Sequence, residues 1–166
     1  YEPVDGAPEA SCSQPMFGWG TKVIQRFDGD SAAWDISSVA LTQQWLWFGS
    51  TVQGISGIPS DFVLSTSNRL DPAGDYWRIE RENLPLPRVT ALTEESQDRV
   101  WAIMTDEEGV MGGVALVEPN EVLLWLDAST IGGVPRAIDV SDETDFLWIV
   151  HEGGITSLPS PRIPSM

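Results

Sequence analysis

The stretch Leu86–Asp127, LPRVTALTEESQDRVWAIMTDEEGVMGGVALVEPNEVLLWLD, decides the fold. It contains four short apolar runs separated by turns rich in Asp, Glu, Gly, Pro and Asn: Arg88–Leu92, Arg99–Met104, Gly113–Val117 and Val122–Leu126. Runs of this length, rich in Val, Ile, Leu and Trp, predict strands rather than helices. The turns are too short for a crossover helix, so we expect the four strands to pair antiparallel as one meander.

The same pattern recurs at intervals of about 50 residues. Pro87 and Pro135 are 48 residues apart, and Trp101 and Trp148 are 47 apart. On the other side, Trp47 lies 54 residues before Trp101. A period near 50 with four strands in each unit is typical of propellers and related arrays. Because Trp101 and Trp148 occupy the same step of the repeat, we expect both to be buried against the next sheet.

The repeat divides the chain into units. The first complete unit has predicted strands at Asp35–Leu41, Gln44–Phe48, Asp61–Leu64 and Tyr76–Ile79, with a polar insertion at Ser65–Asp75. In its second strand we expect the face formed by Trp45 and Trp47 to be buried. The predicted boundaries are an arm or linker at 1–15 and a propeller-like β domain at 16–166, comprising a partial blade at 16–30, blades at 31–85 and 86–133, a partial blade at 134–158 and a tail at 159–166.

This set of units predicts an all-β fold, a partial β-propeller of four-stranded antiparallel blades. A closed propeller generally needs four or more blades, so we expect a fragment of a longer polypeptide or closure by self-association. The first residue is Tyr1 rather than Met, which also favours a fragment. A β-sandwich is the alternative, because strand periodicity alone does not distinguish the two.

One motif is specific enough to suggest a family. A Pro-Arg-aliphatic start and an acidic turn precede Asp-x-aliphatic-Trp and then Gly-Gly-Ile, the latter part running from Asp145 to Ile155. This pattern resembles the blades of sensor-type and NHL-like β-propellers and is similar to the propeller repeats of tail nozzle proteins of short-tailed phages. The resemblance covers about residues 35–158. It implies a propeller fold and a structural role in a virion, in the tail or neck, or in another large assembly.

Composition limits the partners. The formal net charge is −16, which repels phosphate, so we expect neither nucleic acid nor an anionic membrane as partner. A basic protein surface or a cation fits this charge better. No apolar run approaches the roughly 20 residues that span a bilayer, so we expect no membrane insertion. The one cysteine, Cys12, excludes an internal disulfide.

The sequence offers little for catalysis. It has a single histidine, His151, and neither a Gly-x-Ser-x-Gly elbow nor a phosphate-binding loop. We therefore expect no enzymatic activity and no cofactor. Calcium is an alternative at the acidic turns, which we expect to gather on one rim of the array: Glu94-Glu95, Asp106-Glu107-Glu108 and Asp142-Glu143.

Four residues are candidates for contact with a ligand or partner. Arg88 and Arg136 follow a proline at the same place in two units, where they can pair with acidic loops of the adjacent blade or bind a carboxylate in a central channel. Trp34 and Trp77 lie outside the best-aligned positions. Two functions are compatible with these residues: a structural module that contacts other protein chains, including copies of itself, or a glycan-binding propeller lectin that uses exposed Trp. An extracellular or virion location is favoured.

Overall fold

The computed structural model describes residues 35–61, 77–96, 98–141 and 144–160. The predicted arm at 1–15, the partial blade at 16–30, the insertion at 65–75 and nearly all of the tail lie outside these residues. Trp34 lies outside them as well.

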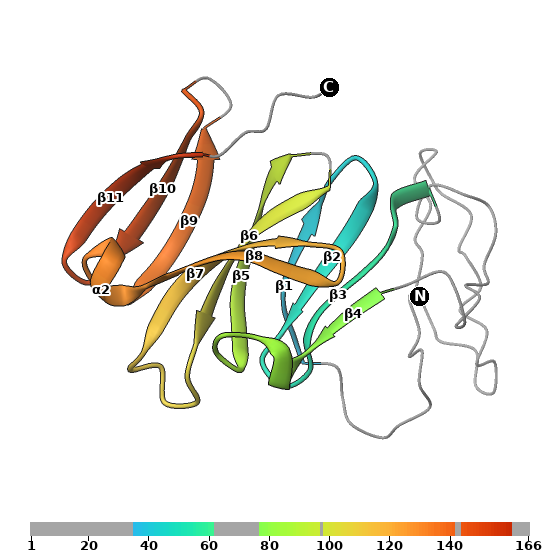
Figure 1. The fold of residues 1–166 in the computed structure, drawn as a ribbon, viewed down its shortest axis with the longest axis horizontal. Coiled ribbons are helices and arrows are strands. Elements are labelled where there is room, and N and C mark those ends of the chain that lie inside the picture. Colours follow the sequence, from blue (N-terminus) through green and yellow to red (C-terminus); the bar gives the residue numbers. More distant parts are fainter. Residues whose placement is uncertain (1–34, 62–76, 97, 142–143, 161–166) are drawn as a thin grey trace, which may run out of the picture. The chain divides into compact units, whose positions relative to one another are not determined.

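The described chain forms three antiparallel sheets in sequence order, which confirms the all-β prediction (Figure 1). Each sheet is a meander whose neighbouring strands follow one another in the chain. The first sheet contains β1 (Ile36–Leu41), β2 (Trp45–Ser50), β3 (Gly54–Pro59) and β4 (Trp77–Glu80). The second contains β5 (Arg88–Ser96), β6 (Arg99–Thr105), β7 (Gly112–Glu118) and β8 (Glu121–Asp127). The third contains β9 (Pro135–Ser141), β10 (Phe146–His151) and β11 (Gly154–Pro159).

Two short helical turns carry the chain from one sheet to the next. The 3-10 turn η1 (Arg81–Asn83) follows the first sheet, and the single α-helical turn α2 (Ala128–Ile131) follows the second. Asp127 caps α2, because its side chain accepts a hydrogen bond from the Thr130 amide. No side-chain cap is present at the start of η1.

One predicted strand is wrong. The third strand of the first sheet is β3, at Gly54–Pro59, whereas the prediction placed it at Asp61–Leu64, of which the structure describes only Asp61. Two glycines and a proline make β3 resemble a loop in sequence. The structure gives the reason for one glycine, since a Cβ at Gly57 would lie 2.5 Å from the Trp77 ring. The strand therefore lacks a side chain where an aromatic ring from β4 covers it.

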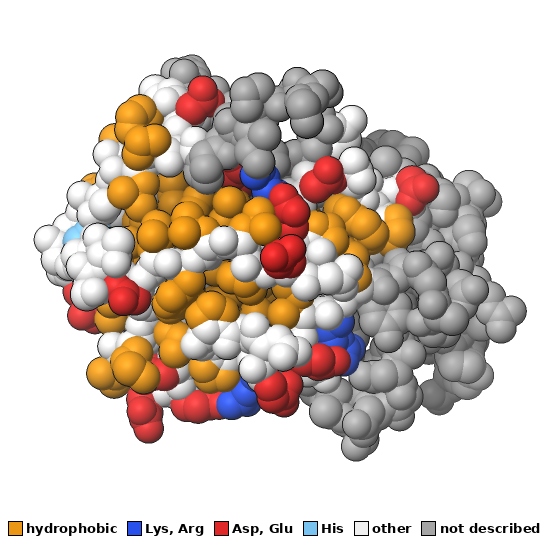
Figure 2. Space-filling view, viewed as in Figure 1, with side chains coloured by type: hydrophobic (Ala, Val, Ile, Leu, Met, Phe, Trp, Pro, Cys, Tyr) orange, Lys and Arg blue, Asp and Glu red, His pale blue; other side chains and the backbone are white. Residues whose placement is uncertain are grey.

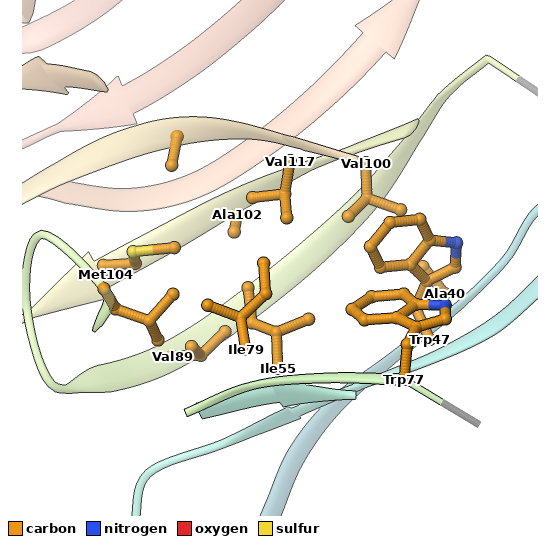
Figure 3. Close-up of a cluster of buried hydrophobic side chains, with 12 residues drawn as sticks. Ala40, Trp47, Ile55, Trp77, Ile79, Val89, Val100, Ala102, Met104 and Val117 are labelled. Carbon is orange, nitrogen blue, oxygen red and sulfur yellow. The ribbon is translucent and has the colours of Figure 1, made fainter. Parts of the chain in front are cut away.

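The first and second sheets pack face to face around Trp47 and Trp77 (Figure 3). The two rings meet edge to face with centroids 4.6 Å apart, and the Trp47 indole nitrogen donates to Thr42 Oγ1. This confirms that the Trp face of β2 belongs to the core. Aliphatic side chains of the two sheets complete the cluster: Ile55 and Ile79 from the first, and Val89, Val100, Ala102, Met104 and Val117 from the second.

The second and third sheets pack around Trp101, which is 1% exposed. Ile103, Val114 and Leu116 share its cluster with Leu147 and Ile149 of β10, and Ile131 of α2 closes one side. The side chains of β6 and β7 thus alternate between one core and the other, so both faces of these two strands are covered. This explains the continuous apolar sequence of β6 and β7.

A buried ion pair lies within the β5–β6 hairpin, and its glutamate also bonds to the end of the third sheet. Arg99 Nε lies 2.9 Å from Glu95 Oε2, and both side chains are almost completely buried. The other carboxylate oxygen of Glu95 accepts a hydrogen bond from Ser160 Oγ, just beyond β11. The β5–β6 hairpin is thereby bonded to the chain that leaves the third sheet.

Trp148 was predicted to be buried, and this prediction is wrong. It points to the same side of its sheet as Trp101 does, away from the preceding sheet, but it is 44% exposed. The physical reason is that Leu147 and Ile149 take up the inner face of β10, and strand alternation turns Trp148 outward. In the described part of the chain, no further sheet covers that outward side.

Candidate functional site

The four sequence-based candidates do not come together in one site. Trp77 is buried in the first core, with Trp45 and Trp47 rings around it, so it is not an exposed platform for a sugar. The glycan hypothesis requires Trp77 to be exposed, and this expectation is wrong. Trp34 is outside the described residues.

Arg88 and Arg136 occupy equivalent positions, and both contact their own sheet. Arg88 Nη1 donates to the backbone oxygen of Glu107 in the β6–β7 turn, at 2.8 Å. Arg136 forms an exposed ion pair with Glu152 in the β10–β11 turn. The expected pairing with an adjacent blade is therefore wrong for these two residues. Arg81 of η1 makes the contact between sheets instead, through an ion pair with Glu107.

The acidic turns do not form one rim. Glu94 pairs with Val100 near the start of β6, whereas Asp106-Glu107-Glu108 follows Thr105 at the other end of that strand. Asp106 already accepts backbone hydrogen bonds from Val110 and Met111 within its own turn. Among the residues that the structure describes, no group of three or more His, Cys, Asp or Glu side chains is placed to hold a metal ion. Asp142 and Glu143 are not among them.

Hydrogen bonds on both ring nitrogens hold the His151 side chain in place. Its Nδ1 accepts a hydrogen bond from the Gly153 amide at 3.1 Å, and its Nε2 lies 3.0 Å from Thr156 Oγ1. That hydroxyl donates in turn to the backbone oxygen of Ile131 at 2.7 Å. The chain of bonds requires the neutral tautomer with the proton on Nε2. The ring thus joins the β10–β11 turn to α2.

The feature that stands out is the outer face of the third sheet, the side turned away from the second. It carries four exposed apolar side chains on β10 and β11: Phe146, Trp148, Val150 and Ile155. Residues paired across antiparallel strands share a face, so Asp139 and Ser157 flank Trp148 on this side. An exposed apolar cluster with a polar surround is typical of a protein contact surface.

Sequence reasoning missed three members of this face, Phe146, Val150 and Ile155. The signal was present, because the run Phe146–Val150 is apolar at every position. A strand of that kind is expected to be covered on both faces, as β6 is.

The face of the molecule that Figure 2 shows carries more acidic than basic side chains. On the face shown in Figure 2, Asp and Glu side chains are spread along the border, with few Lys or Arg among them. Hydrophobic side chains gather over the middle of that view, and Leu123 and Leu124 of β8 are both about two-fifths exposed. No described helix is long and apolar enough to cross a membrane.

Comparison with known proteins defines the class of fold. No protein-family model matches the sequence, and no curated protein matches it. One solved structure similar to this chain is that of PorZ, described as an essential bacterial surface component of the type-IX secretion system of Porphyromonas gingivalis. The TM-score is 0.52 at 17% identity, over 75% of this chain and 17% of PorZ. The likeness supports a β-rich repeat fold, and this chain matches only a small part of PorZ.

Proposed function

We propose that this chain is a non-enzymatic structural module made of β-propeller blades, and that it contacts other protein chains within a large assembly. The observation that carries the proposal is the uncovered apolar face at the end of a stack of sheets. Trp47, Trp101 and Trp148 all point toward the next sheet position, and only at Trp148 does no described sheet follow.

The way in which the sheets approach one another favours propeller blades over a sandwich. The first strands lie together, β1 against β5 and β5 against β9. The strands at the other edges, β4, β8 and β11, approach no strand of a neighbouring described sheet as closely. Sheets that are close at their first strands and further apart at their last are arranged like blades around an axis.

The proposal also concerns the kind of assembly in which the chain takes part. A phage tail or neck, or another extracellular complex, suits a charged, repeat-built module without catalytic groups. The likeness to a component of a bacterial secretion system supports an assembly role in general and does not favour the virion over other assemblies. A binding partner with a neutral or basic contact surface suits the net charge of −16.

The test is whether the outer face drives association. We expect the full chain to bind a hydrophobic dye and to associate with increasing concentration, measured by light scattering after size exclusion. Ile155→Asp should abolish both properties without lowering the melting temperature. Val110→Asp is the matched control, because Val110 is equally exposed but lies in the β6–β7 turn. A monodisperse monomer that binds no dye would count against the proposal.

A glycan-binding role has weaker support. Of its two candidate residues, Trp77 is buried and Trp34 is not described. A glycan array with the full chain tests this role directly, and an absence of binding at millimolar sugar removes it.

A further inference from the structure

In each of the three sheets, a side-chain acceptor holds the turn between the second and third strands. In the first sheet the acceptor is Ser50 Oγ, to which two turn amides donate at 3.1 and 3.0 Å. In the second sheet it is Asp106 Oδ1, to which two turn amides donate at 2.8 and 3.1 Å. In the third sheet it is His151 Nδ1, to which the Gly153 amide donates at 3.1 Å. The third turn therefore depends on an imidazole nitrogen.

Ser50 and His151 are equivalent residues with different chemistry. Each is the last residue of the second strand, and Ser50 lies opposite Gly54 as His151 lies opposite Gly154. A hydroxyl oxygen accepts hydrogen bonds throughout the neutral range, and a carboxylate ordinarily stays ionised above about pH 5. An ordinary histidine takes up a second ring proton at about pH 6.5. Of these three kinds of acceptor, the imidazole is the one that mild acidification removes.

The second ring nitrogen determines where that proton binds. Thr156 Oγ1 donates its single proton to the Ile131 backbone oxygen at 2.7 Å, so it accepts from His151 Nε2, 3.0 Å away. Because Nε2 already carries a proton, a second proton binds at Nδ1. There it faces the N–H of Gly153, and a donor meets a donor. Protonation of the ring therefore breaks the hydrogen bond that holds the β10–β11 turn.

Close backbone packing limits any reorientation of the ring. A Cβ on Gly132 or Gly133, which follow α2, would lie 3.1 or 3.0 Å from a ring atom. A Cβ on Gly153 would lie 3.2 Å from Nδ1. The His151 ring thus contacts two glycine-rich turns, one that follows the second sheet and one within the third. A new orientation of the ring has to move one of these turns.

The charged side chains of the surrounding elements are bonded elsewhere or lie on the other face. Arg136 of β9 and Glu152 of the β10–β11 turn pair with each other. The Asp127 carboxylate caps α2. Asp139 of β9 lies opposite Trp148, on the outer face of the sheet. α2, β11 and the rest of β10 contain no ionisable side chain. In the described part of the chain, no carboxylate is hydrogen-bonded to the ring, so none compensates for the lost bond of an imidazolium.

We propose that His151 is a proton-sensitive joint between the second and third sheets. The neutral ring connects Gly153 of the β10–β11 turn to Ile131 of α2 through Thr156. Uptake of a second proton removes the bond to Gly153 and loosens the turn. The unfolded chain has no such bond to lose, so acidification favours unfolding of the third sheet. The inference does not depend on the proposed function, because it concerns how the third sheet is held and not what contacts it.

The direct test is NMR of the 15N-labelled full chain between pH 8 and pH 5.5. The chain has one histidine, so the ring signals belong to His151. Long-range 1H–15N spectra identify the tautomer, and we expect the proton on Nε2 at pH 8. The Gly153 amide signal should shift with the same midpoint as the ring signals. The Val52 amide is the control, because it donates to Ser50 Oγ, and its signal should stay in place.

A matched variant separates the proton from the hydrogen bond. In His151→Asn, Oδ1 can take the place of Nδ1 as acceptor for the Gly153 amide, but it takes up no proton. From pH 7.5 to pH 5.5, the melting temperature of the wild type should fall by about 2–4 °C relative to that of the variant. This is the shift expected for about one hydrogen bond in a domain of this size. The acidic residues are common to both proteins, so their titration cancels in the difference.

Three results would overturn the inference. The first is a ring that carries its proton on Nδ1 at pH 8, because Nδ1 is then not an acceptor. The second is a Gly153 amide signal that stays in place while the ring takes up its second proton. The third is a melting temperature with the same pH dependence in the wild type and in His151→Asn. If His151→Asn does not fold, the two NMR measurements on the wild type decide the question.

Discussion

Trp101 and Trp148 occupy the same position in two neighbouring sheets, yet Trp101 is 1% exposed and Trp148 is 44% exposed. Both lie in the second strand of a meander, both are flanked by aliphatic residues, and both point away from the preceding sheet. The difference arises from the neighbour on the outer side of each sheet. The third sheet covers Trp101, and no described sheet covers Trp148. The position within the repeat sets the direction of a side chain, and the neighbouring sheet sets its burial.

The largest expected effect tests this difference directly. Trp101→Ala should lower the free energy of unfolding by about 3–5 kcal/mol, because it leaves a cavity in a core covered from both sides. Trp148→Ala should lower it by less, by about 1 kcal/mol, because nearly half of the side chain is exposed already and no enclosed cavity forms. Urea denaturation of both variants measures the two values. Equal losses in the free energy of unfolding would contradict this difference and show that Trp148 is covered in solution.

The next effect concerns the buried ion pair of the β5–β6 hairpin, whose Glu95 also bonds to Ser160 at the end of the third sheet. Glu95→Gln leaves the buried Arg99 guanidinium without its carboxylate and should cost about 3 kcal/mol. Arg136→Gln, which breaks an exposed pair with Glu152, should cost less than about 1 kcal/mol. Urea melts of the two variants provide the comparison. A loss for Glu95→Gln as small as that for Arg136→Gln would show that burial adds nothing to this pair.

Much of this arrangement could be predicted from the sequence, for a physical reason. β6 and β7 of the second sheet are covered on both sides and are therefore continuous apolar runs, and all four strands of that sheet were predicted. The third sheet was predicted as a partial blade at 134–158, because its Pro135 and Trp148 repeat Pro87 and Trp101. The placement of a third strand at Asp61–Leu64 was wrong, because Gly57 is explained only by the Trp77 ring from β4, which is distant in sequence.

The candidate contact surface, the outer face of the third sheet, was harder to predict from the sequence. Trp148 was expected to be buried because its local sequence matches that of Trp101. Burial, however, depends on a neighbouring sheet and not on local sequence. Trp77 was a candidate because it falls outside the aligned positions, yet the glycine opposite it makes room for its ring in the core. Arg88 and Arg136 were expected to pair with an adjacent blade, but their partners lie within their own sheets.

A smaller effect distinguishes the β2–β3 hairpin, where Trp47 lies opposite Gly57, from the β10–β11 hairpin, where Trp148 lies opposite Ser157. Gly57→Ser introduces into the first hairpin the residue that the third sheet has at this position. It should cost about 1–3 kcal/mol, because the new Cβ overlaps the buried Trp77 ring. The reverse change, Ser157→Gly, should cost no more than about 1 kcal/mol, the usual effect of glycine within a strand. Thermal melts of both variants measure the asymmetry. A tolerated Gly57→Ser would show that the Trp77 ring can move to admit the new side chain.

The smallest effect concerns the two turns that connect the sheets. Hydrogen bonds from Ser129 and Thr130 to the Asp127 carboxylate, the Ser129 bond foremost, lower its pKa from the ordinary value of 3.8. Because the folded pKa lies below the unfolded one, the cap stabilises the protein fully above the unfolded pKa, and this contribution is lost as the pH falls through the folded pKa. Asp127→Ala should therefore melt at a lower temperature than the wild type at pH 7, and the gap should shrink toward pH 3. Glu80→Ala is the matched control, because Glu80 precedes η1 without a capping hydrogen bond from its side chain. Its melting temperature should follow the wild type at both pH values. A gap for Asp127→Ala that stays constant down to pH 2 would show that the carboxylate does not hold the turn between the second and third sheets.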